Sequence, residues 1–293
     1  MNELLFKIFN CCIRFFTGGE AIASESRTKE FSIPTGSCHA QWLLGASAAK
    51  HPKHTVPQMG CFTGEPFDGC ELDYSWHIFR KGELEVLRVE YQNPNPWQII
   101  EAEIAHNNAT IRYIAPEGQV PPAIDPYVFP FTNLLFTRIL HHQNGVLVHA
   151  SGINDNGNGY IFTAVSGTGK STMAGLWAQK GGQVINDDII AITTHEGIQI
   201  HNIPMPHYSD HPKSATLKAI FIIKQSPRNY IMPLKGASAA MLLMANCIQQ
   251  FGTPEYVRQH LATISAIAAQ VPIYEAGFLP DTNIVDLIRH EIG

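Results

Sequence analysis

Short runs that alternate apolar and polar residues dominate the first part of the chain. The stretch "SWHIFRKGELEVLRVEY" (75–91) alternates on both sides of Lys81-Gly82, which predicts a β-hairpin. The segment "ATIRYIAP" (109–116) is typical of another strand, and a single first strand is expected around Leu5 to Phe16. We therefore expect a β-rich beginning to the chain.

The pattern changes after "EGQVPPAIDP" (117–126), whose prolines and glycine indicate a boundary. We expect a smaller β-rich N-terminal region over residues 1–125 and a second domain over 126–293, in which apolar runs of strand length alternate with helical spacing. This order predicts an α/β fold with a mixed sheet and flanking helices. The predicted helices cover 128–143, 171–180, 238–252, 254–270 and 281–292, and the main predicted strands cover 145–153, 160–164, 183–187, 217–225 and 272–278.

Composition narrows the class of protein. Apolar residues make up 45% of the 293 residues, enough for a sizeable core, and the net charge of −5 comes without a basic run. A general nucleic-acid binder is disfavoured because it needs a basic surface to neutralise phosphates. Charged residues interrupt the apolar N-terminus, and no run approaches the ~20 residues of a membrane span. We expect a cytoplasmic protein with no membrane partner.

The cysteines carry no metal-binding spacing. None of the six forms a CxxC pair, and a zinc site would require Cys61 and Cys70 to combine with distant ligands. Reduced, mostly buried thiols are the favoured interpretation for a cytosolic chain. The six are Cys11, Cys12, Cys38, Cys61, Cys70 and Cys247.

The stretch "YIFTAVSGTGKST" (160–172) has the form of a phosphate-binding loop, with an apolar strand before it and a helix starting at its Lys-Ser end. Its glycines would let backbone N–H groups converge on phosphate oxygens at a helix N-terminus. Lys170 would reach the β- and γ-phosphates, and the Ser171 hydroxyl would bind Mg²⁺. Ala164 replaces the first glycine of the usual pattern, at a position that ends the strand and tolerates alanine if φ is negative. The alternative is a Gly/Ser-rich turn that ends in Lys-Ser by chance.

Two aspartates follow the next strand. Asp187 ends "QVIND" and Asp188 follows it directly. The helix between the loop and this segment lets the chain return as a strand that we expect to be parallel and adjacent to the loop strand. One carboxylate would then hold Mg²⁺, and the other would accept a proton from an attacking hydroxyl. The alternative is a pair of turn or cap aspartates.

His149, in the apolar strand "GVLVHASGI" (145–153), is a further candidate. Beside a phosphate loop it could ligate a metal or orient an acceptor. Taken alone it is more simply a core histidine whose hydrogen bonds are satisfied.

Weaker candidates lie further along the chain. Arg258 could meet a phosphate, although a surface charge is the simpler interpretation. The proline-rich stretch 203–215 could close over an acceptor or hold a metal, or it could be a solvated loop; its polar residues are His207, Asp210, His211 and Lys213.

The order of these elements resembles the HPr kinase/phosphorylase and phosphoenolpyruvate carboxykinase superfamily. The resemblance rests on "GVLVHASGI", "GYIFTAVSGTGKST" and "GQVINDDIIAI", spans about residues 143 to 204, and implies a P-loop core of that type. It implies that ATP is bound, that Lys170 stabilises the transferred group, that Ser171 and Asp188 bind Mg²⁺, and that Asp187 is the general base, with the two aspartates open to exchange. The phosphate-binding residues implied are Ser166, Gly167, Thr168, Gly169, Lys170, Ser171 and Thr172.

Two departures limit the resemblance. The bifunctional HPr kinase/phosphorylases resemble "HGVLVD" where this chain has "NGVLVH", so Asn144 replaces a catalytic histidine and His149 an aspartate. This argues against phosphorolysis, and no arginine-rich oxaloacetate site of carboxykinase type is visible. The chain is most similar to the smaller HPr-kinase-related proteins, some of which phosphorylate a serine in a precursor peptide.

The sequence therefore predicts a Mg-ATP-dependent kinase that acts on a hydroxyl, most simply a serine of a peptide or protein. A small-molecule kinase with the same core and a nucleotide-binding regulatory module without chemistry are the alternatives. Residues 1–125 would supply part of the acceptor cleft or an assembly surface, and a homo-oligomer is left open.

Overall fold

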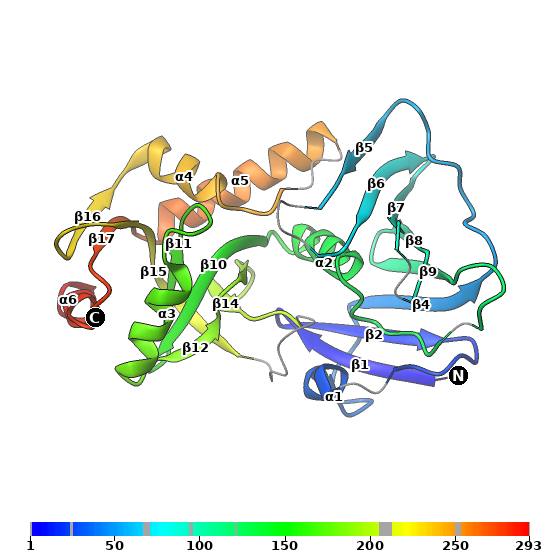
Figure 1. The fold of residues 1–293 in the computed structure, drawn as a ribbon, viewed down its shortest axis with the longest axis horizontal. Coiled ribbons are helices and arrows are strands. Elements are labelled where there is room, and N and C mark those ends of the chain that lie inside the picture. Colours follow the sequence, from blue (N-terminus) through cyan, green and yellow to red (C-terminus); the bar gives the residue numbers. More distant parts are fainter. Residues whose placement is uncertain are drawn as a thin grey trace. The chain divides into compact units, whose positions relative to one another are not determined.

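The computed structural model describes the chain except residues 1, 24–25, 67–70, 94–95, 121, 205–212, 250–252 and 293, and the side chains of 26–28. The chain divides into two compact units (Figure 1). The first comprises Met1–Phe136 and Pro204–His211, and the second Thr137–Ile203 and Pro212–Gly293. The sequence-based boundary between residues 125 and 126 precedes this division, which falls within a helix, α2 (Phe131–His142).

A nine-stranded mixed sheet forms the first unit, in the order β3-β1-β2-β4-β9-β8-β7-β6-β5. The predicted hairpin at 75–91 is confirmed, with Gly82 at φ 63° in its turn. The elements of the first unit before α2 are β1 (Asn2–Ile8), β2 (Cys11–Thr17), α1 (Ser26–Phe31), β3 (Ser32–Ile33), β4 (Trp42–Ala49), β5 (Cys61–Gly64), β6 (Tyr74–Lys81), β7 (Leu84–Tyr91), β8 (Ile99–Ala105) and β9 (Asn108–Ile114).

The N-terminal segment differs from the prediction of one strand. Phe9 and Asn10 both adopt positive φ, 56° and 60°, so the chain reverses and β1 pairs with β2 as a hairpin. Asparagine tolerates this left-handed conformation, whereas phenylalanine rarely adopts it. Because apolar residues flank the turn on both sides, periodicity alone did not reveal the reversal.

The expectation of reduced thiols is wrong for one pair: Cys12 on β2 is bonded to Cys38. The bond joins residues 26 apart in sequence, and the backbone N–H of Cys12 also donates to Gln41 Oε1 at 3.1 Å. Cys11 and Cys247 are free and buried, Cys61 is free and partly exposed, and Cys70 lies outside the described residues. Disulfides persist mainly in oxidising compartments, so this bond does not support a cytoplasmic location.

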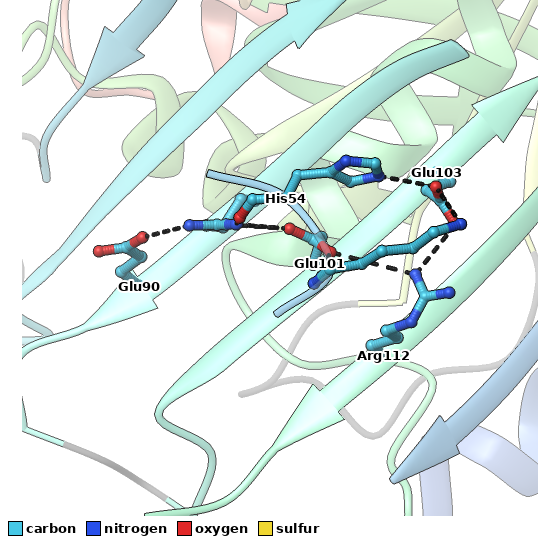
Figure 2. A network of polar contacts seen from close by, with 7 residues as sticks. His54, Glu90, Glu101, Glu103 and Arg112 are labelled. Carbon is cyan, nitrogen blue, oxygen red and sulfur yellow. Dashed lines mark hydrogen bonds and ion pairs between the residues drawn. The ribbon is translucent and has the colours of Figure 1, made fainter. Parts of the chain in front are cut away.

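Charged side chains form a buried network on one face of this sheet (Figure 2). Arg88 of β7 binds Glu101 of β8, with 2.6 Å between Nη2 and Oε2, and also donates to the carbonyl oxygen of His54. His54 Nε2 lies 2.7 Å from Glu103 Oε1, and Arg112 of β9 donates to the same carboxylate at 3.0 Å. The network holds the chain around His54 against the sheet.

Glu103 is the most strongly perturbed group of the network. Burial acts to raise the pKa of Glu103, but hydrogen bonds from Lys53, His54 and Arg112 outweigh it and hold that pKa at about 2. The carboxylate is therefore ionised at neutral pH, and its stabilising effect is present above its ordinary pKa and lost as the pH falls toward 2.

The second unit contains an eight-stranded mixed sheet whose pairing closes on itself, because β15 hydrogen-bonds to both β14 and β11. Buried apolar side chains of this unit form two clusters against the sheet: α4 and α5 contribute to the first, and α3 and α6 contribute to the second. Its elements are β10 (Val146–Asp155), β11 (Asn158–Thr163), α3 (Lys170–Gln179), β12 (Gln183–Asn186), β13 (Ile189–Thr193), β14 (Gln199–His201), β15 (Ser214–Gln225), β16 (Tyr230–Leu234), α4 (Gly236–Met244), α5 (Pro254–Gln270), β17 (Ile273–Phe278) and α6 (Asn283–Ile292).

The predicted fold class, an α/β core of P-loop type with flanking helices, is wrong. The chain forms two large mixed sheets of nine and eight strands, and its described residues contain only six helices, most of them short. Tight polar turns such as Asn156-Gly157 join successive strands as antiparallel hairpins, whereas a parallel pair requires a long crossover connection. Within the described part of the chain no helix is long and apolar enough to cross a membrane.

The buried network generates a stability prediction. Replacing Glu101 by alanine removes the carboxylate that pairs with the buried Arg88 guanidinium. Removing one partner of a buried ion pair typically destabilises the folded state by about 3–5 kcal/mol. Glu101→Ala should therefore lower the free energy of unfolding by that amount in urea titrations. Glu83→Ala, at the exposed β6–β7 turn, serves as a control and should change it by less than about 0.5 kcal/mol. Equal effects of the two substitutions would contradict the structural role of the network.

Candidate functional site

The glycine-rich loop lies between β11 and α3 in the second unit. Strand β11 pairs with β10 as a hairpin through the turn Asn156-Gly157. Gly167 and Gly169 have φ of 79° and 116°, a region that side-chain-bearing residues rarely adopt, and α3 starts directly afterwards at Lys170. The loop therefore depends on glycine at both positions.

Ala164 fits the loop without strain. It is buried, and it is not among the described residues with a left-handed backbone, as the sequence argument required. Its carbonyl oxygen accepts a hydrogen bond from Lys170 Nζ at 3.1 Å, and the Val165 carbonyl lies 3.4 Å from the same nitrogen. The lysine side chain thus folds back over the loop. Burial lowers the pKa of Lys170, and the Asp188 carboxylate opposes that shift.

Two hydroxyl groups that were not singled out from the sequence join β10 to the start of α3 and to the end of β11. Ser151 Oγ donates to the Lys170 carbonyl at 2.8 Å, and Thr163 Oγ1 donates to the His149 carbonyl at 2.7 Å. Both residues are fully buried. Small hydroxyl residues inside apolar strands were the available signal, because a buried hydroxyl requires a partner.

The aspartates occupy the break between β12 and β13. Both strands pair antiparallel with β10, so β10 lies between them and β11, and the expected direct adjacency to the loop strand is wrong. Asp188 nevertheless lies level with the end of β11, since Ala150 is paired with Thr163 and its N–H donates to the Asp188 carbonyl at 2.9 Å.

Asn186 shapes this break. It is 5% exposed, and its Oδ1 accepts hydrogen bonds from the N–H groups of Asp188 at 2.8 Å and Ile189 at 3.1 Å. In this turn the asparagine side chain supplies the hydrogen-bond acceptor for backbone N–H groups where the strand is interrupted. Asn186 therefore positions both aspartates, and only the Asn-Asp-Asp sequence could have indicated it.

His149 and Asp188 form the central pair of the site. His149 Nε2 lies 3.5 Å from Asp188 Oδ1, and both side chains are nearly half exposed, at 42% and 45%. Burial lowers the pKa of His149, and the Lys170 charge adds to this, while Asp188 opposes it. Burial raises the pKa of Asp188, and the nearby Asp187 adds to this, while His149 and Lys170 oppose it. His149, Lys170 and Asp188 are therefore coupled electrostatically, and Asp187 acts on Asp188.

The remaining predicted loop residues face solvent to different degrees. Ser166, Gly167, Ser171 and Thr172 are exposed, and Thr168 is partly exposed with its hydroxyl donating to the Val165 carbonyl at 2.8 Å. In the described residues no group of three or more His, Cys, Asp or Glu side chains could hold a metal by itself. A divalent cation at this site would thus need other oxygen ligands besides Asp188.

A pocket of 510 Å³ opens on the other side of the loop. The loop and the first turn of α3 contribute Thr168, Gly169 and Thr172 to its lining. The ends of β15 and β17 contribute residues 225–227, Phe278 and Pro280.

Other predicted candidates are placed away from this chemistry or outside the described residues. His207, Asp210 and His211 lie outside them, whereas Lys213 donates from Nζ to the Val184 carbonyl at 2.9 Å. Arg258 forms an exposed ion pair with Glu255 at 3.1 Å, which fits a surface charge.

Asn144, the residue at the position of the missing histidine, has φ 52°, and its Oδ1 accepts from Gln259 Nε2 of α5 at 3.0 Å. Its side chain is thus engaged in a helix contact.

Comparison with known proteins adds one similarity. The model of the family described as SynChlorMet cassette protein ScmC matches residues 132–277, just under half of the chain. The match includes β10, the glycine-rich loop, α3 and the two aspartates. The comparison with curated proteins gives no match.

The raised pKa of Asp188 predicts a gain in stability when its charge is removed. A carboxyl group whose pKa is higher in the folded than in the unfolded state destabilises the fold once the pH exceeds its unfolded value of about 3.9. Asp188→Asn should therefore raise the melting temperature at pH 7, and the gain should disappear below about pH 4. Calorimetry at both pH values tests this, with the exposed Glu196→Gln as control. A lower melting temperature of Asp188→Asn at pH 7 would contradict it.

Proposed function

We propose that this chain is a Mg-ATP-dependent kinase that transfers the γ-phosphoryl group to a hydroxyl, most simply a serine of a peptide or protein. The observation that carries the proposal is the His149–Asp188 pair, 3.5 Å apart, electrostatically coupled to Lys170 of the glycine-rich loop. A structural turn would not require a buried lysine, a histidine and two carboxylates at one sheet edge. The resemblance of residues 143–204 to HPr-kinase-related proteins supports the same activity.

The loop would hold the phosphates. Residues 166–169 are exposed or partly exposed, and they lie at the start of a ten-residue helix, where backbone N–H groups can turn toward an anion. The Thr168 N–H, which donates to the Val165 carbonyl at 3.4 Å, would exchange that bond for a phosphate oxygen. Lys170 Nζ, now bonded to the Ala164 and Val165 carbonyls, would exchange these for phosphate oxygens. An ammonium group so placed stabilises the charge of the transferred group.

Asp188 and the Ser171 hydroxyl would bind the cation. Hard cations such as Mg²⁺ prefer oxygen ligands, and phosphate oxygens and water complete their coordination in kinases. The two side chains fit that preference because both offer oxygen atoms. Both are also accessible to a cation, since Asp188 is only half buried and Ser171 is exposed. When bound, Mg²⁺ supplies positive charge to the phosphates. His149 would orient the Asp188 carboxylate through their contact.

Asp187 would act as general base. It would accept the proton of the acceptor hydroxyl while a bond forms between that oxygen and the γ-phosphorus and the bond to the leaving ADP breaks. Asn186 would keep both carboxylates in position through its bonds to the backbone N–H groups of Asp188 and Ile189. Exchange of the two aspartate roles is the nearest alternative.

The acceptor is the open part of the proposal. Small-molecule transfer and nucleotide binding without chemistry remain as alternatives, and the ScmC description names a cassette without stating a reaction. Incubation with labelled ATP and either serine-containing peptides or metabolites separates the first two. ATP binding without transfer to any acceptor would favour a regulatory module.

The compartment is a separate question. An ATP-dependent enzyme is expected in the cytoplasm, whereas the Cys12–Cys38 bond favours an oxidising compartment.

The base assignment predicts a loss of rate without a loss of binding. Asp187→Asn removes the proton acceptor and should lower kcat by roughly 10²- to 10⁴-fold, the usual contribution of general base catalysis, while the Kd for ATP changes little. Phosphotransfer rates and equilibrium binding provide the measurements, and Glu196→Gln is the matched control. Undiminished turnover by Asp187→Asn would eliminate it as the base.

The metal assignment predicts a different defect. Asp188→Asn removes a charged Mg²⁺ ligand, so we expect the Mg²⁺ concentration for half-maximal activity to rise, on the order of tenfold or more. Titration of activity with Mg²⁺ at saturating ATP measures the shift. If Asp187→Asn shifts the Mg²⁺ requirement and Asp188→Asn does not, the two roles are exchanged.

A further inference from the structure

Three parallel strands end at the edge that carries the loop. Strand β15 pairs in parallel with β11 on one side and with β17 on the other. Their carboxyl ends are Thr163, Gln225 and Phe278, and Gln225 is directly paired with Phe278. Crevices outside the carboxyl ends of parallel strands are the usual ligand sites of such sheets. The 510 Å³ pocket lies at this edge.

The walls of the pocket are held by internal hydrogen bonds. The Ser226 N–H donates to the Phe278 carbonyl at 3.1 Å, which joins the segments leaving β15 and β17. Asn229 Oδ1 accepts from the Leu279 N–H at 2.8 Å, and Asn229 Nδ2 donates to Asp281 Oδ1 at 3.0 Å. These contacts fix both segments to each other, so the pocket is preformed.

The chemistry of the lining is mixed in a way that suits a flat heteroaromatic ligand. Phe278, Pro227 and Pro280 supply apolar surface, and the exposed Gln225 adds an amide with both donor and acceptor groups. Ligand sites commonly combine mostly apolar walls with few polar groups. An inorganic anion would gain nothing from the apolar part.

Phe278 connects the pocket to the loop. A Cβ placed on Gly169 would come within 2.9 Å of Cζ of the Phe278 ring, so the ring packs directly against the last glycine of the loop. Because Gly169 belongs to both the loop and the pocket lining, a ligand in the pocket continues directly into the phosphate-binding loop.

The strand order places the pocket and the catalytic groups on opposite sides of the loop. Going across the sheet, the order is β17, β15, β11, β10 and then β12 and β13. The pocket lies at β15 and β17, the loop follows β11, and His149 and Asp188 lie at β10 and β13. From β15 to β10 is two strand spacings, roughly 10 Å. An extended ligand would thus present one end to the pocket and the other to His149.

We propose that this pocket binds the base and ribose of the nucleotide whose phosphates occupy the loop, with Gln225 at its polar edge. The inference rests on the proposed function, because it assumes a nucleoside triphosphate as the ligand. It adds a direction: the triphosphate runs from β15 toward β10, so that its terminal phosphorus is presented to Asp187 and Asp188.

Binding of ATP and of inorganic tripolyphosphate, each with Mg²⁺, tests this by calorimetry on the full chain. We expect wild type to bind ATP at least tenfold more tightly than tripolyphosphate. Gln225→Trp obstructs the pocket at an exposed position and should raise the Kd for ATP tenfold or more, while the Kd for tripolyphosphate stays within about twofold. Thr216→Trp, also exposed and about 30 Å away along β15, is the control and should change neither value.

The outcomes separate the two proposals. Equal affinity for ATP and tripolyphosphate in wild type, with no effect of Gln225→Trp on ATP, overturns the base pocket and leaves the phosphate loop standing. Failure of wild type to bind either ligand overturns the proposed function, and the base pocket with it. Equal weakening of both ligands by Gln225→Trp would mean that the substitution disturbs the loop, and it would also overturn the base pocket.

Discussion

Strand β10 hydrogen-bonds to β11 along one side and to β12 and β13 along the other, and the candidate site depends on these ladders. They bring the end of β11, where the loop begins, level with the break that carries the aspartates. Ala150 illustrates the constraint, because it is paired with Thr163 while its N–H bonds the Asp188 carbonyl. A shift of register in either ladder would separate Lys170 from Asp188.

The site contains groups that the fold alone would not favour. Lys170 and His149 have lowered pKa values and Asp188 a raised one, in each case chiefly because burial disfavours the charged form. Gly167 and Gly169 adopt conformations that cost other residues free energy. Such concentrations of unfavourable local choices are common at functional sites. In the first unit, by contrast, the buried charges around Glu101 and Glu103 are paired with one another, which is a structural arrangement.

The two sides of the loop have different chemistry. On the β10 side lie the histidine and the carboxylates, which suit a cation and a proton transfer. On the β15 side lies a pocket with apolar walls. Lys170 and the glycines lie between them, and Phe278 packs against Gly169. This asymmetry defines how an elongated ligand with one apolar and one charged end would lie.

The sequence by itself determined the local features of this protein. The strand, glycine turn and helix around Lys170 were predictable because residues 160–179 favour these conformations locally, and the hairpins at Gly82 and Gly157 follow from the same turn chemistry. Only the tertiary structure decided which strands are neighbours. It placed β10 between the loop and the aspartates, ended α4 at Met244 because Asn246 and Ile248 hydrogen-bond to β10, and brought Cys12 to Cys38. The role of Ser151 became recognisable through its hydrogen bond to Lys170, and that of Asn186 through the break in strand pairing between β12 and β13. The strand pairings, the disulfide and the Ser151 bond join residues far apart in sequence, and periodicity and turn propensity carry no information about such pairings.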